Sequence, residues 1–467
     1  MRAGTHHEGP APRSRLGLRA VGSLVLALLA TSASAQDTNY WNLQYGPVGQ
    51  LLGGQVIGSS RGLSATYYNP GGLALEEDTA FLLSTESFQA EDVSSTPTSP
   101  DVEAFDVSSL RFGTFPTLVA GGLPRSWLGQ RTRMAWSFLT RQKLDVRLGE
   151  RLEDPFEMPG GSSAAEQYVD QQVTEGWGGL TLAYELSETL GVGASLYGVY
   201  RGQFSRSELS FQALSAEEEA LTGLSITDYS YSHFRTLAKL GVAWQRGNVH
   251  LGLNVTTPSL ALFGSGDAGY TASLVGVDAD GNGIPDPPVL VSDTAEDVDA
   301  YYRSSWAIGG GFAWKRGDTR WQASAEWFAP VDRFTVIDVP AEGGRFQGNL
   351  TQELRSVFNV GLGVEHDVGD ALVLYGAALT DFSAAPGDPR VNATATTWDL
   401  YHLTSGVKFA VAGSRFTLGA TVTFGGDRRP PTTLISPPER LAGEGIDTDL
   451  DVKYRRVVVL LGFLFGQ

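Results

Sequence analysis

The sequence predicts an all-β protein: a 14-stranded antiparallel transmembrane β-barrel with an N-terminal plug, or hatch, inside its lumen. Three observations predict this class. Apolar side chains alternate with small or polar ones along much of the chain, the connections between these segments alternate in length, and the longest apolar run of the mature chain spans only 457–465. A membrane helix needs about 20 apolar residues, and only helices and closed barrels satisfy every backbone polar group in lipid. A membrane form of this chain is therefore a barrel.

Residues 1–35 read as an export signal. Arg13, Arg15 and Arg19 form a basic region, an apolar core follows at 21–30, and Ala33-Ser34-Ala35 fits a small-residue cleavage site. The apolar core is too short for a membrane span. We expect cleavage after Ala35, and together with the barrel pattern this indicates the bacterial outer membrane.

Charge and composition exclude several classes of partner. The signal holds four Arg and one Glu, so its removal changes the net charge from −18 to −21. Such an acidic chain argues against nucleic acid as a partner. The absence of Cys excludes a disulfide framework and thiol chemistry. No cofactor is required by anything in the sequence.

Residues 36–77 do not share the strand pattern and form the expected hatch. Their apolar side chains carry too much surface to remain solvated, and a barrel lumen is the available packing site. These side chains are Leu51, Leu52, Val56, Ile57, Leu63, Tyr67 and Tyr68.

Residues 78–467 carry the pattern of the barrel. Apolar residues alternate with small or polar ones at 190–200, 306–314, 358–365 and 416–424. Because successive side chains of a strand leave opposite faces, this period of two indicates strands.

Connection lengths favour a barrel over a soluble sandwich. Short turns alternate with long polar connections, as in outer-membrane barrels. The turns lie at 187–189, 246–248, 315–318, 367–370 and 411–414, and the long connections at roughly 149–167, 205–227, 259–299, 329–350, 382–397 and 426–450. Two expected strands each carry a Trp residue near both ends: Trp306 and Trp314 on one, and Trp321 and Trp327 on the next. This placement favours two interfacial girdles facing outer-membrane lipid. The alternative is that they are core residues of a soluble β-protein.

A ten-residue box gives the hatch a family resemblance. The segment Ala65-Thr66-Tyr67-Tyr68-Asn69-Pro70-Gly71-Gly72-Leu73-Ala74 resembles the hatch box of FadL/TodX-type outer-membrane transporters, with Gly71 in place of the usual Ala. The end of the chain, Gly466-Gln467, departs from the terminal aromatic residue of many such barrels.

The resemblance implies a passive transporter of hydrophobic small molecules, either long-chain fatty acids or hydrocarbons. It also implies lateral release through a gap that a kinked strand makes in the barrel wall. Asn69, Pro70 and Gly71 would form a rigid gating turn, because Pro fixes φ and Gly permits a positive φ. Tyr67 and Tyr68 become candidate ligand contacts. We expect a monomer.

One loop has the composition of a calcium site. Asp278, Asp280, Asn282 and Asp286 place oxygen ligands at positions 1, 3, 5 and 9 of a Gly-rich loop. Val289 at position 12 excludes an EF-hand. The alternative is an acidic loop that is simply solvated.

Two other functions compete with transport. A barrel of the same fold could serve as a structural or secretion-associated scaffold. An outer-membrane hydrolase is the third hypothesis, since His250, His366 and His402 could face a lumenal site. No G-x-S-x-G box or paired His motif supports it, so we predict that the protein is not an enzyme.

Overall fold

The computed structural model describes residues 38–59, 62–76, 79–97, 106–111, 113–124, 129–153, 161–215, 219–276, 285–338, 350–369, 371–386, 398–411, 414–429 and 450–466. The expected export signal at 1–35 lies outside these residues, as do Asp278, Asp280 and Asn282 of the expected calcium loop. Asp286 is described, and the described residues hold no cluster of three or more His, Cys, Asp or Glu suited to a metal.

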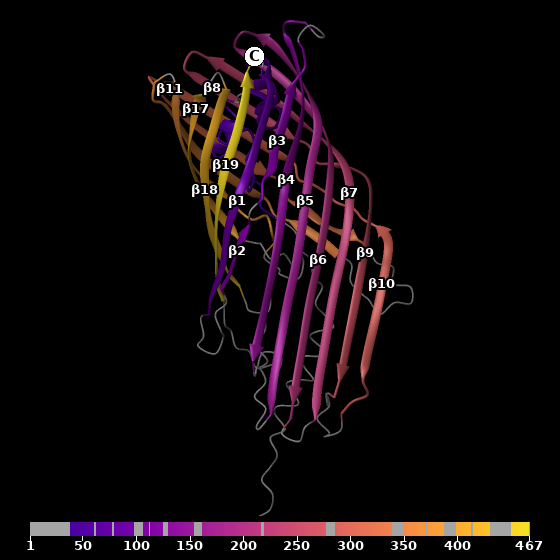
Figure 1. The fold of residues 1–467 in the computed structure, drawn as a ribbon. Coiled ribbons are helices and arrows are strands. Elements are labelled where there is room, and N and C mark those ends of the chain that lie inside the picture. Colours follow the sequence, from indigo (N-terminus) through magenta and orange to yellow (C-terminus); the bar gives the residue numbers. More distant parts are fainter. Residues whose placement is uncertain are drawn as a thin grey trace, which may run out of the picture.

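The elements follow one another as a short helical segment and then a long series of strands (Figure 1). The helical elements are α2 (Pro47–Leu51), η1 (Gly62–Ser64), α3 (Ala65–Tyr68) and η2 (Pro70–Leu75). The strands are β1 (Thr79–Pro97), β2 (Asp106–Arg111), β3 (Phe115–Gly122), β4 (Thr132–Glu153), β5 (Ser162–Ser187), β6 (Leu190–Leu214), β7 (Ala220–Arg246), β8 (Val249–Thr256), β9 (Leu260–Val275), β10 (Val289–Asp299), β11 (Ala307–Arg316), β12 (Thr319–Phe328), β13 (Val331–Ile337), β14 (Leu350–Leu354), β15 (Val357–Asp367), β16 (Leu372–Asp381), β17 (Asp399–Val411), β18 (Ser414–Arg429) and β19 (Leu450–Gly466). In the described part of the chain, no helix is long and apolar enough to cross a membrane.

The strands close into a 14-stranded antiparallel barrel, as predicted. The main sheet contains 17 strands, and β1 pairs with β19 to close it. Three strand positions are each divided in two. β2 and β3 both pair with β1, β8 and β9 both pair with β7, and β10 and β11 pair with β9 and β8. The 17 strands therefore occupy 14 positions in the wall.

The outer face of the barrel carries exposed apolar side chains, whereas the inner face carries buried residues of both kinds, apolar and polar. Leu196, Leu253 and Leu362 are 62%, 52% and 67% exposed, whereas the neighbouring Tyr197 is fully buried. The four Trp residues of the expected girdles are each at least 37% exposed. Their interpretation as core residues of a soluble protein is therefore wrong.

Three of the six expected long connections, 149–167, 205–227 and 259–299, consist mostly of strand, which corrects the sequence-based boundaries. β6 continues to Leu214 and β7 begins at Ala220, so the connection expected at 205–227 spans only 215–219. These outer strand ends present polar residues such as Ser230 and Ser232 on the outer face. Backbone pairing needs no apolar side chains on a face that meets water. The apolar alternation in the sequence therefore stops at a point where the strands themselves continue. Strands β4 to β7, together with β9 and β10, accordingly extend far beyond the rest of the wall (Figure 1).

Two features mark the extended side. Within the described residues, β10 pairs along one edge only, with β9. The hairpin of β13 and β14 leaves the main sheet, and its Phe334, Val336 and Leu350 pack against Tyr229 and Tyr231 of the inner face of β7. The hairpin thus fills the space beside the extended strands.

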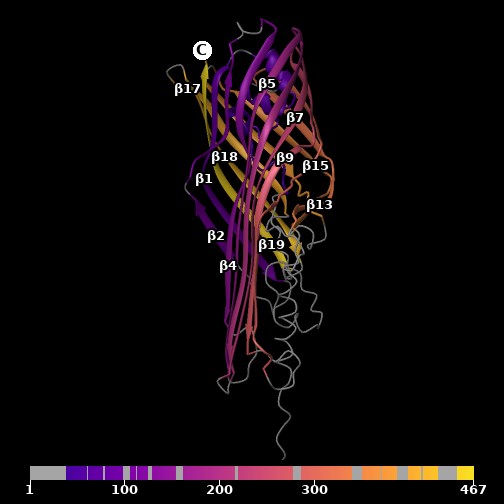
Figure 2. The same ribbon diagram turned by 90° about the vertical axis from the view of Figure 1, so that its right-hand side faces the viewer.

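The N-terminal segment, residues 38–76, lies within the ring of strands. Its helical elements stand near the end of the barrel where the short turns and the C-terminus lie (Figures 1 and 2). Leu51, Leu52 and Leu63 are almost completely buried and join Tyr197 and Leu237 of the wall in one apolar cluster. The packing site expected for these apolar residues is therefore the inner face of the wall.

Candidate functional site: a charged cavity beside an interrupted wall

Asn69 and Pro70 fix the N-terminal segment to β7. Asn69 Nδ2 donates to the carbonyl oxygens of Val242 (2.9 Å) and Ile57 (3.1 Å), and Asn69 Oδ1 accepts from Gly71 N (3.2 Å). Asn69 is thus the cap of η2, and Pro70 occupies its first turn, where no N–H is needed. We call residues 47–75 the anchor.

Gly71 serves close approach, and its expected positive φ is wrong. Residues 70–75 form a 3₁₀ helix, and Gly71 does not adopt a positive φ. A Cβ at Gly71 would stand 2.7 Å from the carbonyl oxygens of both Gly191 and Gly241. The wall glycines and Gly71 therefore let two backbones come together where any side chain would separate them.

The first described residues, 38–41, are held differently, and we call them the latch. Asp381 Oδ1 accepts from the backbone N of both Tyr40 and Trp41, each at 2.9 Å. The hydroxyls of Thr38 and Ser383 are hydrogen-bonded at 2.7 Å. A backbone hydrogen bond from Ala384 N to Thr38 O (3.0 Å) and packing of the Trp41 ring complete its hold on the wall.

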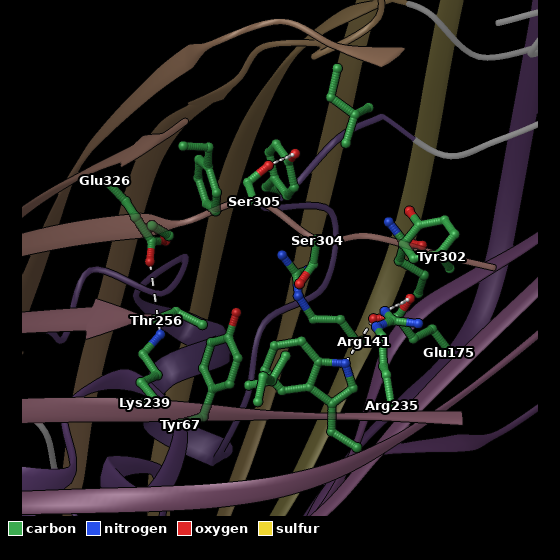
Figure 3. A pocket seen from close by; sticks show the side chains of 17 residues that line it. Tyr67, Arg141, Glu175, Arg235, Lys239, Thr256, Tyr302, Ser304, Ser305 and Glu326 are labelled. Atoms are coloured by element: carbon green, nitrogen blue, oxygen red, sulfur yellow. Dashed lines mark hydrogen bonds and ion pairs between the residues drawn. The ribbon is translucent and has the colours of Figure 1, made fainter. Parts of the chain in front are cut away.

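A cavity lies between Tyr67 of the anchor and Tyr40 of the latch, lined by residues of β4, β5, β7, β8, β11, β12 and β14 (Figure 3). It leaves about 60 Å³ for the centres of water-sized molecules, room for a few waters. Its lining combines three cations and two carboxylates with aromatic rings. The residues that matter below are Tyr40, Tyr67, Arg141, Glu175, Trp177, Arg235, Lys239, Tyr302, Glu326 and Phe328.

Glu175 is the centre of one ion-pair network in this cavity. Its Oε2 lies 2.7 Å from Arg235 Nη2 and 3.1 Å from Arg201 Nη1, and its Oε1 accepts from Trp177 Nε1 at 2.7 Å. Tyr302 lies between the two guanidinium groups, whose Cζ atoms are 4.4 and 4.6 Å from its ring centroid. Glu175 is therefore saturated with partners.

Glu326 connects the cavity to the latch. Its Oε1 is 3.8 Å from Lys239 Nζ, and its Oε2 accepts from Trp41 Nε1 at 2.8 Å. The tyrosine ring of the latch, Tyr40, stacks on Phe328 with centroids 3.9 Å apart. A change at Lys239 can thus reach the latch through a single carboxylate.

The two expected tyrosine contacts separate in the structure. Tyr67 lines the cavity, with Lys239 Nζ 4.4 Å from its ring centroid. Tyr68 holds the segment together, because its hydroxyl donates to Gln44 Oε1 and accepts from Tyr45 N, both at 2.9 Å. Burial raises the pKa of both phenols well above its usual value, so both hydroxyls stay protonated.

Arg141 points into the cavity because β4 is bulged there. The register with β5 shifts between Thr140 and Gln142, and a bulge re-aims the side chains next to it. Arg141 and Gln142 are both buried, each only 7% exposed. Arg141 Nη1 has no hydrogen-bond acceptor among the described residues, and no described carboxylate lies within ion-pair distance of Arg141.

The ladder of the wall is interrupted beside this bulge. Within the described residues, β4 pairs with β3 only at residues 135–139, and β2 pairs only with β1. The contact nearest the break is the hydrogen bond from Thr140 Oγ1 to Pro116 O, 2.8 Å. We call the break between β2 and residues 140–153 of β4 the ladder gap.

Local sequence explains the gap. Pro116 has no N–H for the ladder, and the β1–β3 register shifts beside it, leaving Thr117 as an extra residue. At nearly the same height β1 carries a second irregularity at Phe88, whose φ of 23° is strained for a side chain of this size. β2 therefore pairs with β1. Among the described residues, residues 140–153 of β4 then have a strand partner on one edge only, namely β5.

The N-terminal segment directly contacts the irregular stretch of wall where the β1–β3 register shifts, around Ser84 and Thr117. We call this stretch the kink. Gln50 Nε2 of α2 donates to Thr117 Oγ1 (3.1 Å), and Gly46 N donates to Ser84 Oγ (3.0 Å). The Ser84 and Thr117 hydroxyls are in turn hydrogen-bonded at 2.9 Å. The anchor thus supports the bent stretch of wall.

Sequence reasoning placed Asn69, Pro70, Gly71 and Tyr67 in one region but missed the charged lining. Arg235 and Lys239 stand on the inward parity of β7, with Leu237 between them. An ionisable residue at an inward position of a strand was the available signal.

The histidines of the hydrolase hypothesis do not share a site in the described structure. His402 Nδ1 is hydrogen-bonded to Thr423 Oγ1 (2.8 Å) within the wall, and His366 Nδ1 to Thr319 Oγ1 (2.9 Å) at an exposed turn. His250 lies on β8 at the short-turn end.

Comparison with known proteins gives a likeness of fold. No family model and no curated protein matches the sequence. The Pseudomonas putida toluene transporter TodX is similar in structure, with a TM-score of 0.53 and 12% identity over 91% of this chain and 99% of that one. A Pseudomonas aeruginosa FadL homologue gives a TM-score of 0.53 and 12% identity over 93% and 99%. The fold is therefore that of the TodX and FadL-homologue structures, which confirms the resemblance seen in the hatch box. TodX, the first of these structural neighbours, is a toluene transporter.

Proposed function

We propose that this protein is a passive outer-membrane transporter of hydrophobic small molecules, with residues 38–76 acting as a plug. The observation that carries the proposal is the coincidence of the cavity with the ladder gap. Arg141 lines the cavity, and the preceding residue Thr140 makes the last contact across the wall before the gap.

The outer face supports insertion into a membrane. The apolar side chains form a band around the part of the wall nearest the short turns, where Trp314 and Trp321 are both exposed. Burying such a band in lipid is favourable by about 25 cal/mol per Å². In this orientation the tips of the extended strands, β4 to β7 with β9 and β10, lie on the outer side of the membrane.

A lateral route suits an apolar solute. The anchor lies across the short-turn end of the lumen and packs closely against the wall glycines there. An apolar solute gains nothing from entering water, so release through the ladder gap into lipid costs less than passage through the anchor. The latch forms the movable roof of the cavity, because hydrogen bonds to Asp381, Ser383 and Glu326 make up much of its hold on the wall and can be exchanged for bonds to water.

The scaffold hypothesis has no comparable support. A barrel with a purely structural role needs neither an enclosed charged cavity nor an interrupted ladder.

Tethering the latch tests the proposal. The native chain has no Cys, and the Thr38 and Ser383 hydroxyls are 2.7 Å apart, close enough for a disulfide after small shifts. Cells carrying the T38C/S383C variant should take up radiolabelled toluene or decanoate at the rate of cells without the gene when oxidised, and regain uptake on reduction.

The matched control joins two wall strands and leaves the latch free. Thr404 and Thr421 have their hydroxyls 2.8 Å apart on β17 and β18, so T404C/T421C should transport under both conditions. Wild-type uptake equal to that of cells without the gene contradicts the transport function. Undiminished uptake by the oxidised T38C/S383C variant contradicts the moving latch.

A further inference from the structure

The cavity carries more positive than negative charge. Four cations, Arg141, Arg201, Arg235 and Lys239, surround two carboxylates, Glu175 and Glu326. The described residues around the cavity thus leave an excess of two positive charges. Buried charge without a counter-charge is costly, so such a cluster is expected where a negative ligand completes it.

The unfilled hydrogen-bonding capacity points to the position of that ligand. Arg141 Nη1 and Arg235 Nε and Nη1 are buried donors without an acceptor. Both side chains line the cavity, and both are almost fully buried. Glu175 and Glu326 cannot serve Arg141, because each is occupied by other donors. Among the described residues no free carboxylate remains for Arg141, so we look for the acceptor in a ligand.

The rest of the lining selects the body of the ligand. Tyr67, Trp177 and Tyr302 present rings to the cavity, together with Tyr40 and Phe328 of the stacked pair. Aromatic pairs gain roughly 0.5–1.5 kcal/mol beyond burial of area. The open space, about 60 Å³, is compact, which suits a short flat molecule better than a long alkyl chain.

We propose that this cavity binds a compact carboxylate that bears an aromatic ring, with the carboxylate between Arg141 and Arg235. The inference rests on the proposed function, since it names the substrate class of that same site. A neutral hydrocarbon would leave the two guanidinium groups without an acceptor. The carboxylate also attracts Lys239 away from Glu326, which weakens the hold of Glu326 on Trp41 of the latch.

Calorimetric titration of the purified protein in detergent tests the site, with benzoate as the probe. Toluene supplies the ring without the charge, and cyclohexanecarboxylate supplies the charge without the aromatic ring. Benzoate should bind more tightly than either, and more tightly than cyclohexanecarboxylate by roughly two- to tenfold. Equal binding of the two acids overturns the aromatic assignment.

Arg141 provides the decisive variants. Arg141→Gln should weaken benzoate binding by roughly ten- to a hundredfold without weakening toluene binding, whereas Arg141→Lys should retain most of it. Lys315→Gln, at the short turn after β11, is the matched loss of a cation and should bind as the wild type does. A heat-modified gel shift for each variant establishes that the barrel has formed.

The outcomes separate this inference from the transport function. Absence of benzoate binding to the wild type, or equal binding to Arg141→Gln and wild type, overturns the carboxylate site even where toluene uptake persists. Benzoate binding that depends on Arg141 supports the site, whether or not cells take up a hydrophobic solute. Absence of any uptake counts against transport alone.

Discussion

The two ends of the N-terminal segment meet the wall in opposite ways. The anchor lies with its backbone against wall glycines, so that Gly71 faces the carbonyl oxygens of Gly191 and Gly241 at van der Waals distance. The latch reaches the wall through hydrogen bonds to Asp381, Ser383 and Glu326. Close packing has no alternative partner nearby, whereas a hydrogen bond can be exchanged for one to water or ligand. The latch also has packing contacts, through the buried Trp41 and the stacked Tyr40, but the difference in its polar contacts teaches that it is the more readily released of the two ends.

The largest effect should come from breaking the anchor. A side chain at Gly241 would collide with Pro70 N and Pro70 Cδ, both 2.8 Å from its Cβ. Gly241→Val should therefore lower the free energy of unfolding by about 3 kcal/mol, measured by urea titration of the folded fraction on gels. Gly310→Val is the control, because nothing lies within 4 Å of a Cβ there. Similar losses in the two variants would contradict the close-packing account.

Loss of the latch should cost less and remain local. Asp381→Ala removes the acceptor of Tyr40 N and Trp41 N, worth about 2 kcal/mol for bonds to a charged group. The expected readout is faster proteolysis within residues 38–45 while the barrel stays folded. Asp367→Ala removes an exposed ion pair with Lys315 and should leave proteolysis unchanged. Protection of the latch in Asp381→Ala would show that other contacts hold it.

The smallest effect concerns the link between anchor and kink. Gln50→Ala removes the donor to Thr117 Oγ1, at a cost of about 1 kcal/mol. Faster amide hydrogen exchange at residues 115–118 should follow, without release of the latch. Gln172→Ala on β5 removes only a bond to Asp170 and serves as the control. Unchanged exchange at the kink would mean that β3 bends without help from α2.

The sequence predicted what depends on local alternation. Leu196 and Tyr197 lie on opposite faces because neighbouring residues of a strand must, so the class and the strand number followed. The extended strands escaped prediction because their outer faces, as at Ser230, meet water and need no apolar residues. Alternation of apolar residues indicates a strand with one face buried in lipid or in a core. A strand with no such buried face lacks this pattern and cannot be predicted from it.

The candidate site was predictable only where one segment holds it. Asn69, Pro70 and Tyr67 follow one another in the chain, so a short motif revealed them. Arg141 and Glu326 are brought together by strand register around a whole barrel, and Arg141 enters the cavity through a bulge. One extra residue in a ladder leaves no mark that the sequence alone displays.

Among the described residues, β10 pairs only with β9, so its other edge has no strand partner. This affects how the side of the barrel with the extended strands contacts its surroundings. An open strand edge invites another strand to add to it. Here the last part of that edge carries Asp293, Glu296, Asp297 and Asp299, and Asp297 adopts a φ of 53° where the register with β9 breaks. Repulsion between like charges and a twisted backbone make this edge a poor template for stacking. Copies of the barrel that lie close together should therefore not join their sheets through the β10 edge.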